Sequence, residues 1–211
     1  MYVPPVNRVD DEEAIRAMVA AAASGWLVTA AEDGVPAATL LPILWNGDTV
    51  VAHMAKANPH WRAIRPGMPA LVICTGPDAY VSPSWYAAKA EHGRVVPTWN
   101  YSSVHLTGTV RVHEDPEWLR TAVTDLTDAH EGGRAEPWAV TDAPPDFVDG
   151  QLRGIVGIEV TVTGVEGKAK LSQNRSAADQ DGVIAGMRAE GSPRARAVAE
   201  QMAAGTQRPV P

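Results

Sequence analysis

Residues 25–55 read "GWLVTAAEDGVPAATLLPILWNGDTVVAHMA" and contain three apolar segments separated by two turn signals. The dipeptides Asp33-Gly34 and Asn46-Gly47 provide the positive φ angles that tight hairpin turns require. The stretch therefore predicts three consecutive antiparallel strands joined by short turns. A meander of this kind makes a β-sheet the basis of the fold.

Later segments continue the sheet. The stretches "PALVICTG" and "AYVSPSW" each predict one strand, and "TWNYSSVHLTGTVRVHE" predicts a longer strand with Tyr101 and His105 on one face. Residues 152–172 return to a strand pattern, so we expect a late strand to complete a barrel begun before residue 113. Short turns and few crossover helices favour a closed or nearly closed antiparallel barrel. The predicted fold class is mostly β with flanking helices, of the α+β kind.

Helical patterns flank the predicted barrel. Asp10 is the expected N-cap of a first helix, with Ile15 and Val19 on its apolar face, and a second helix follows Pro116. From Ser176 onward the chain is alanine-rich and helical in pattern. We predict a barrel domain over residues 1–175, a C-terminal helical segment over 176–205 and a flexible tail over 206–211.

Composition restricts the function. The 211 residues carry a net charge of -7, with a pI near 5.3, which argues against direct DNA binding because phosphate recognition needs clustered lysine and arginine. No stretch approaches the roughly 20 apolar residues of a membrane helix, and "MYVPPVNRVDDEE" has no signal-peptide pattern, so we expect a cytoplasmic protein without membrane contact. The single cysteine, Cys74, cannot form an internal disulfide and is predicted to be a buried strand residue.

Four stretches, together with an initial "MYVP", resemble the PaiB-like proteins: "HMAKANPHW", "AYVSPSWY", "KAEHGRVVPTWNYSSVH" and "KLSQNR". The resemblance covers nearly the whole chain. It implies an FMN-binding split β-barrel that forms a homodimer, with small-molecule ligand sites near the subunit interface. Members of this family are commonly described as FMN-binding negative transcriptional regulators, so the implied function is that of a cofactor-binding regulator or sensor.

The resemblance also extends to piperazate synthase, a haem-dependent enzyme that closes an N–N bond. Those relatives have a shorter loop where this chain keeps "KAEHGRVV", which places the chain nearer the PaiB branch. A third hypothesis is a flavin-dependent oxidoreductase. The expected cofactor is therefore FMN or haem b, and no familiar catalytic motif identifies a catalytic residue.

His53 is the candidate metal ligand. Thr49, Val51 and His53 point one way along a predicted strand, so the His53 ring faces either the barrel interior or a ligand cleft. A neutral imidazole at this place can ligate haem iron, and the alternative is a core histidine bonded to a backbone carbonyl. His60 is expected to pack at the surface or an interface.

Two clusters offer donors to an anion. Lys56 and a helix start at Asn58 suit the phosphate of FMN, unless the lysine is simply solvated. In "KLSQNR", Lys170, Gln173 and Arg175 suit a carboxylate or phosphate, and the alternative for this segment is helix capping.

The aromatic residues Trp85, Tyr86 and Trp99 can wall a flat ring or pack in a dimer interface. The predicted cofactor-binding residues are His53, Lys56, Asn58, Trp85, Tyr86, Trp99, Lys170, Gln173 and Arg175.

Overall fold

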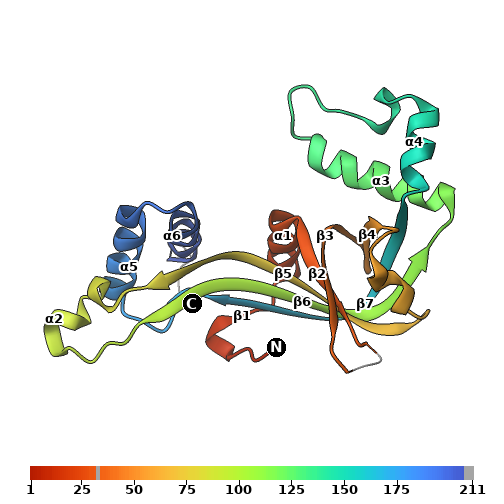
Figure 1. Ribbon diagram of the computed structural model, residues 1–211. Coiled ribbons are helices and arrows are strands. Elements are labelled where there is room, and N and C mark those ends of the chain that lie inside the picture. The colour runs from red at the N-terminus through yellow and green to blue at the C-terminus, as the bar shows by residue number, and fades with distance from the viewer. Residues whose placement is uncertain (32–33, 207–211) are drawn as a thin grey trace. The chain divides into compact units, whose positions relative to one another are not determined.

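The computed structural model describes residues 1–31 and 34–206, in which the strands form a seven-stranded sheet (Figure 1). The strands are β1 (Arg8–Val9), β2 (Ser24–Thr29), β3 (Ala37–Asn46), β4 (Thr49–Ala55), β5 (Met68–Val81), β6 (Thr98–His113) and β7 (Ile155–Lys170). Their order in the sheet is β1-β7-β4-β3-β2-β5-β6, and β6 also pairs with β7. Strands β2 to β7 therefore close into a barrel, as the sequence predicts.

The chain divides into two compact units, which we describe separately. The barrel unit comprises residues 16–74 and 105–165. The terminal unit comprises residues 1–15 and 75–104, together with the chain from Glu166 onward. The long strands β5, β6 and β7 each contribute residues to both units.

Alternate residues of β4 and β7 fill the interior of the barrel unit. The antiparallel register pairs Met54 with Val156 and Ala52 with Ile158, and each of these four side chains is at most 3% exposed. Successive side chains of a strand point to opposite faces, so His53, between two of them, lies on the outer face.

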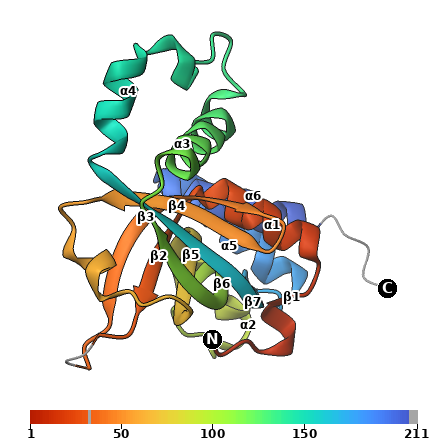
Figure 2. The ribbon, with the colours of Figure 1, turned by 90° about the vertical axis from the view of Figure 1, so that its right-hand side faces the viewer.

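Helices α3 (Pro116–Glu131) and α4 (Pro145–Leu152) belong to the barrel unit, and α3 lies over β3 and β4 (Figure 2). Asp115 caps α3, because its Oδ2 accepts a hydrogen bond of 2.9 Å from the Trp118 N–H. The Trp118 ring covers Gly157 of β7, where a Cβ atom would overlap it. The same ring stacks on His113 with 4.1 Å between the centroids. One tryptophan thus attaches this helix to the sheet.

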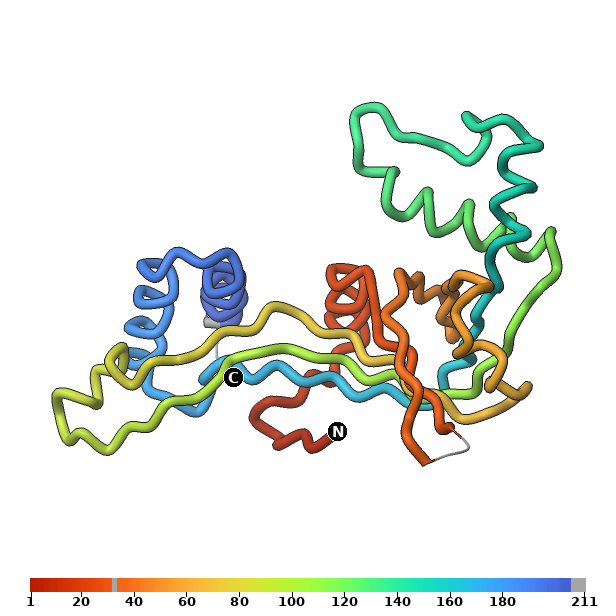
Figure 3. The backbone as a smooth tube through the Cα atoms, viewed as in Figure 1, coloured from red at the N-terminus to blue at the C-terminus, as the bar shows by residue number. Residues whose placement is uncertain are grey.

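Helices α5 (Ala177–Glu190) and α6 (Pro193–Thr206) lie side by side in the terminal unit (Figure 3). They share a hydrophobic core with Ala79 and Val81 of β5, and Val183 and Met187 in this core are fully buried. Gly191 follows α5 with a φ of 81°, which a glycine adopts without strain. The two helices therefore cover one face of the terminal part of the sheet.

The remaining helical elements lie between strands or near the start of the chain. They are the helices α1 (Glu12–Ala22) and α2 (Ala88–His92) and the 3-10 helices η1 (Pro5–Asn7), η2 (Pro59–Ala63), η3 (Pro83–Trp85) and η4 (Val140–Asp142). Across residues 1–31 and 34–206, no helix combines the length and the apolar character that crossing a membrane requires.

Three predicted details of the elements are wrong. The residue that caps α1 is Asp11 and not Asp10, because the Asp11 Oδ1 accepts the N–H of Glu13 at 3.0 Å. The two strands predicted in the middle of the chain are the single strand β5, which continues through Pro77. Pro77 has no backbone N–H to donate to a neighbouring strand. It lies beyond the residues Ala70–Ile73 that pair with β2, so the pairing with β2 tolerates it.

A two-residue turn at Gly47 and Asp48 joins β3 and β4, one residue later than predicted. Gly47 has a φ of 56°, the conformation that such a turn requires of its first central residue. Asp33 of the other predicted turn and residues 207–211 of the predicted tail lie outside the described residues. The domain boundary at residue 175 stays a prediction.

The packing of α3 on the sheet can be tested at Gly157. We expect Gly157→Ala to lower the free energy of unfolding by about 1 to 3 kcal/mol, because the added methyl group overlaps the Trp118 ring. Denaturant titration measures this value. Gly133→Ala is the control, since nothing among the described residues lies within 4 Å of a Cβ atom built there. Equal stabilities of the two variants would contradict the packing described.

Candidate functional site

Two exposed aromatic rings mark one face of the terminal unit. Tyr80 of β5 and Trp99 of β6 are 44% and 54% exposed, and their ring centroids lie 6.1 Å apart at an interplanar angle of 72°. Their sequence neighbours Ala79 and Asn100 are buried on the opposite side, toward α5 and α6. A paired but solvent-exposed set of large rings is typical of a binding surface.

Two lysines of β7 lie beside the aromatic pair. The Lys170 Nζ donates hydrogen bonds of 2.6 Å to the Thr98 Oγ1 and 2.5 Å to the Trp99 carbonyl oxygen. The Lys168 Nζ donates a hydrogen bond of 2.6 Å to the Tyr101 hydroxyl, and Lys168 is 7% exposed. Lys170 is therefore the lysine that reaches solvent beside Trp99.

The positive charge at this face is not balanced by ion pairs to any carboxylate among the described residues. Within residues 1–31 and 34–206, no carboxylate forms an ion pair with Lys168, Lys170 or Arg175. Burial lowers the pKa of Lys170; Tyr101 opposes this effect, and the charges of Lys168 and Arg175 add to it. A bound anion would stabilise the charged ammonium group. We call Tyr80, Trp99, Tyr101, Lys168 and Lys170 the aromatic–cationic face.

The other predicted residues of the terminal unit have internal contacts. Trp85 packs on Gly186 of α5, where a Cβ atom would overlap its ring. Tyr86 is 3% exposed, and the Arg175 guanidinium carbon lies 4.7 Å from the centroid of its ring. Both ends of the Gln173 amide form hydrogen bonds to the backbone: its oxygen accepts the Leu171 N–H, and its nitrogen donates to the carbonyl oxygen of Ala169 in β7. Trp85 and Tyr86 therefore pack within this chain, and their contact with a cofactor stays a prediction.

His53 lies on the outer face of β4 and not in the barrel interior, because Ala52 and Met54 fill that interior. Its Nδ1 is buried and has no hydrogen-bond partner in the part of the chain that the structure describes. Burial lowers the pKa of the imidazole, so the ring is neutral near pH 7. A neutral imidazole with an unpaired ring nitrogen has the form that binds a metal ion.

The predicted phosphate site around Lys56 is occupied by internal contacts. The Lys56 Nζ forms an ion pair of 2.9 Å with Glu114. Asn58 caps η2, since its Oδ1 accepts the N–H of His60 at 3.0 Å and its Nδ2 donates to the Thr39 Oγ1 at 3.3 Å. These contacts balance the lysine charge and use the amide, so this site offers less to a phosphate than the aromatic–cationic face does.

His60 is buried at 7% exposure, which corrects the expectation of a surface position. Its Nε2 lies 2.9 Å from the Thr29 Oγ1, and its Nδ1 lies 2.8 Å from the Thr39 Oγ1. Both ring nitrogens therefore have partners, and the imidazole ties η2 to β2 and β3. The threonines are 31 and 21 residues away in sequence, so the local pattern around His60 does not indicate them.

Sequence reasoning placed Tyr101 on one face of a strand without predicting it as a site residue, and it missed Tyr80 and Lys168. The signal for Tyr80 is its place between Ala79 and Val81, since two buried neighbours in a strand turn the residue between them to the other face. Lys168 has no comparable local signal, because its burial depends on contacts with Tyr101 and the carbonyl oxygen of residue 2.

Comparisons with known proteins identify the family. Residues 1–164 match the family model described as "Putative FMN-binding domain". "Protease synthase and sporulation protein PAI 2" of Bacillus subtilis is 35% identical over 206 residues, which cover 96% of each chain. The chain belongs to the PaiB-like family.

Solved structures share the fold of this PaiB-like chain. The FAD and haem binding protein from Mycobacterium smegmatis has a TM-score of 0.60 and 21% identity, over 88% of this chain and 80% of that protein. The flavocytochrome Anf3 from Azotobacter vinelandii has a TM-score of 0.54 and 17% identity, over 75% of this chain and 67% of that protein. At these identities the comparisons establish the fold, which is the split barrel.

The burial of His60 predicts an acid sensitivity of stability. Burial lowers the pKa of His60 from its ordinary value of 6.5, so below that pH the unfolded chain takes up a proton that the folded chain does not. The contribution of the neutral His60 ring to the free energy of unfolding is fully present above pH 6.5. It is lost as the pH falls toward the pKa of His60 in the folded chain. The free energy of unfolding should therefore fall less steeply between pH 7 and pH 5 in His60→Gln than in the wild type. Parallel curves for the two proteins would contradict this assignment.

Proposed function

We propose that this PaiB-like protein binds a flat, anionic cofactor, which is FMN at the aromatic–cationic face or, as the alternative, haem b at His53. The observation that carries the proposal is the exposed Tyr80–Trp99 pair beside two lysines that have no carboxylate partner among the described residues. Aromatic side chains pack against flat ring systems, and ammonium groups bind phosphate or carboxylate. The face therefore offers aromatic rings to the flat part of such a cofactor and ammonium groups to its anionic part.

FMN is the first candidate. Its ring system would lie against Trp99, and its phosphate would accept hydrogen bonds from Lys170. Lys168 is almost fully buried, so its contribution is positive potential and not direct contact. The description of the matched family and the name of the Mycobacterium smegmatis protein, which mention FMN and FAD, support a flavin as the cofactor.

Haem b is the second candidate, and His53 is the observation that favours it. The buried Nδ1 of His53 has no partner within residues 1–31 and 34–206, and its neutral ring can supply an iron ligand. Bound haem would supply redox chemistry at its iron. The names of two solved relatives, a FAD and haem binding protein and a flavocytochrome, support this alternative.

The proposed role is that of a cytoplasmic, cofactor-binding regulator or sensor of the PaiB type. The net charge of -7 argues that any effect on transcription does not come from tight, direct DNA binding by the chain alone. The two enzymatic hypotheses, N–N bond formation and flavin-dependent oxidoreduction, rest on the family resemblance alone.

Variants at the two candidate sites separate the cofactors. If FMN binds at the aromatic–cationic face, Trp99→Ala and Lys170→Gln should each weaken its binding by about 0.5 to 3 kcal/mol, the range of ring packing and charge-assisted hydrogen bonds. Quenching of flavin fluorescence measures the affinity. If haem binds through His53, His53→Ala should abolish or strongly shift the Soret band.

Trp138→Ala is the matched control, because Trp138 is a tryptophan of the barrel unit with 47% exposure. It should leave the affinity for FMN and the haem spectrum unchanged. FMN binding that survives both changes at the face would refute the proposed site. A haem spectrum unchanged in His53→Ala would return His53 to a purely structural role.

We further propose that the protein is a homodimer that associates through the barrel and the aromatic segment from Trp85 to Tyr101. In this segment, Val96 and Trp99 are 63% and 54% exposed, more than large apolar side chains need to be in an isolated chain. Light scattering at micromolar concentration should give twice the chain mass of 22.4 kDa. A monomer at that concentration would contradict the proposal.

A further inference from the structure

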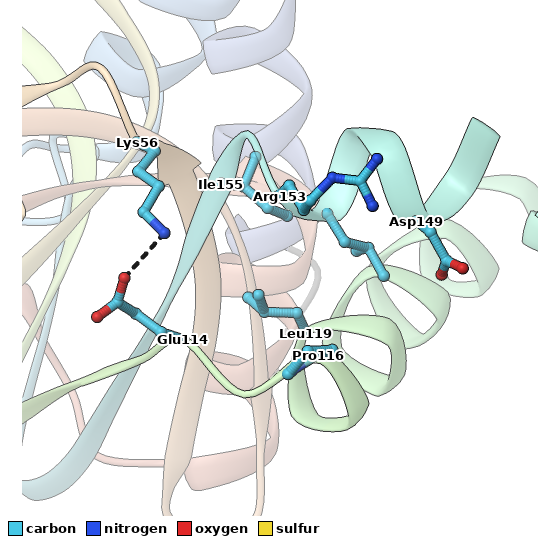
Figure 4. A pocket seen from close by; sticks show the side chains of 8 residues that line it. Lys56, Glu114, Pro116, Leu119, Asp149, Arg153 and Ile155 are labelled. Carbon is cyan, nitrogen blue, oxygen red and sulfur yellow. Dashed lines mark ion pairs between the residues drawn. The ribbon is translucent and has the colours of Figure 1, made fainter. Parts of the chain in front are cut away.

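A cavity of about 590 Å³ lies within the barrel unit, between α3, α4 and the start of β7 (Figure 4). Its volume falls in the range of small-molecule sites, roughly 300 to 1,000 Å³. All of its lining residues belong to the barrel unit, so the cavity is separate from the aromatic–cationic face. We call it the α3–α4 pocket.

The apolar floor of the α3–α4 pocket is preformed. Leu119 of α3 and Leu152 of α4 are 3% and 5% exposed and belong to one hydrophobic cluster, against which Ile155 packs. The cluster that shapes the floor is thus the same cluster that holds the two helices together. A ligand would not have to order these side chains on binding, which favours affinity for an apolar group.

Most charges at the rim of the pocket are already paired. Lys56 forms an ion pair of 2.9 Å with Glu114 on one side of the cavity (Figure 4). On the other side, Asp149 accepts a hydrogen bond and ion pair from Arg120. Each carboxylate of the rim therefore has its own cation.

Arg153 differs from these four residues. It is exposed and lines the pocket, and its guanidinium group has no hydrogen bond or ion pair to any other residue in the portion of the chain that is described. Figure 4 shows its side chain on the Asp149 side of the cavity, away from the Lys56–Glu114 pair. The pocket thus combines an apolar floor with a cation that lacks a partner among the residues that the structure describes.

We propose that the α3–α4 pocket binds a small carboxylic acid with an apolar body. The planar guanidinium group of Arg153 would donate two parallel hydrogen bonds to the carboxylate, and the hydrocarbon part would lie on Leu119, Leu152 and Ile155. A ligand with one negative charge matches the single positive charge of Arg153, since the other charges at the rim are paired. A phosphate dianion would also face Glu114 and Asp149, and an amine would meet Arg153 with no acid left to pair.

The probe for this site is 4-phenylbutyrate, with 4-phenylbutan-1-ol and 4-phenylbutylamine as comparators that keep the apolar body and change the charged group. Titration calorimetry on the full chain should show binding of the acid that is about 10- to 150-fold tighter than that of the alcohol. This range converts the roughly 1.5 to 3 kcal/mol of a charge-assisted hydrogen bond. The amine should bind more weakly than the acid.

Arg153→Gln should reduce the affinity for 4-phenylbutyrate to that for the alcohol, and Arg153→Lys should retain part of the difference. The control is Arg111→Gln, an exposed arginine of the same unit that does not line the pocket. It should bind the acid as the wild type does, and thermal unfolding checks that each variant is folded. Equal affinity for acid and alcohol, unchanged binding in folded Arg153→Gln, or no binding of the acid at millimolar concentration would each overturn the proposal.

Discussion

Strand β7 pairs with β4 from Thr49 opposite Thr161 to Ala55 opposite Ile155, and it also pairs with β6. These two ladders close the barrel. Alternate residues in the first part of the closing strand, Val156, Ile158 and Val160, fill the interior, so the register has little freedom: a slip of one residue would expose this set to the outer face. Features beyond the core also depend on β7, because its first residue lines the α3–α4 pocket and its last residues are the lysines of the aromatic–cationic face.

The same alternation determines which polar groups are available to ligands. In the barrel unit it places His53 outside the core, where burial keeps its ring neutral, and its Nδ1 has no partner in residues 1–31 and 34–206. In the terminal unit it turns Tyr80 and Trp99 away from the helices and leaves Lys170 beside them. Other polar side chains have partners inside the barrel unit: Asn58 accepts the backbone N–H of His60, and the His60 ring is hydrogen-bonded to Thr29 and Thr39. The candidate ligand groups are thus two exposed rings and, among the described residues, a lysine without a carboxylate partner and an imidazole nitrogen without a hydrogen bond.

The sequence predicted the barrel, its closure by a late strand and the burial of Cys74, whose thiol pKa burial raises to about 11. These features follow from local periodicity, which each strand carries in its own residues. The partners of His60 and the burial of Lys168 could not be predicted, because their contacts join residues far apart in the chain. The α3–α4 pocket was missed for the same reason, since Arg153 is recognisable only once the rim acids are seen to be paired with other cations.

The central claim is that this PaiB-like split barrel holds a flavin or haem cofactor. The absorption spectrum of protein freshly purified from cells, recorded before and after addition of FMN or haemin, tests it most directly. The claim predicts the two visible bands of a flavin or the Soret band of haem, either at once or after the cofactor is added and the excess removed. Protein that is colourless when purified, and that retains neither FMN nor haemin after the excess is removed, would contradict it.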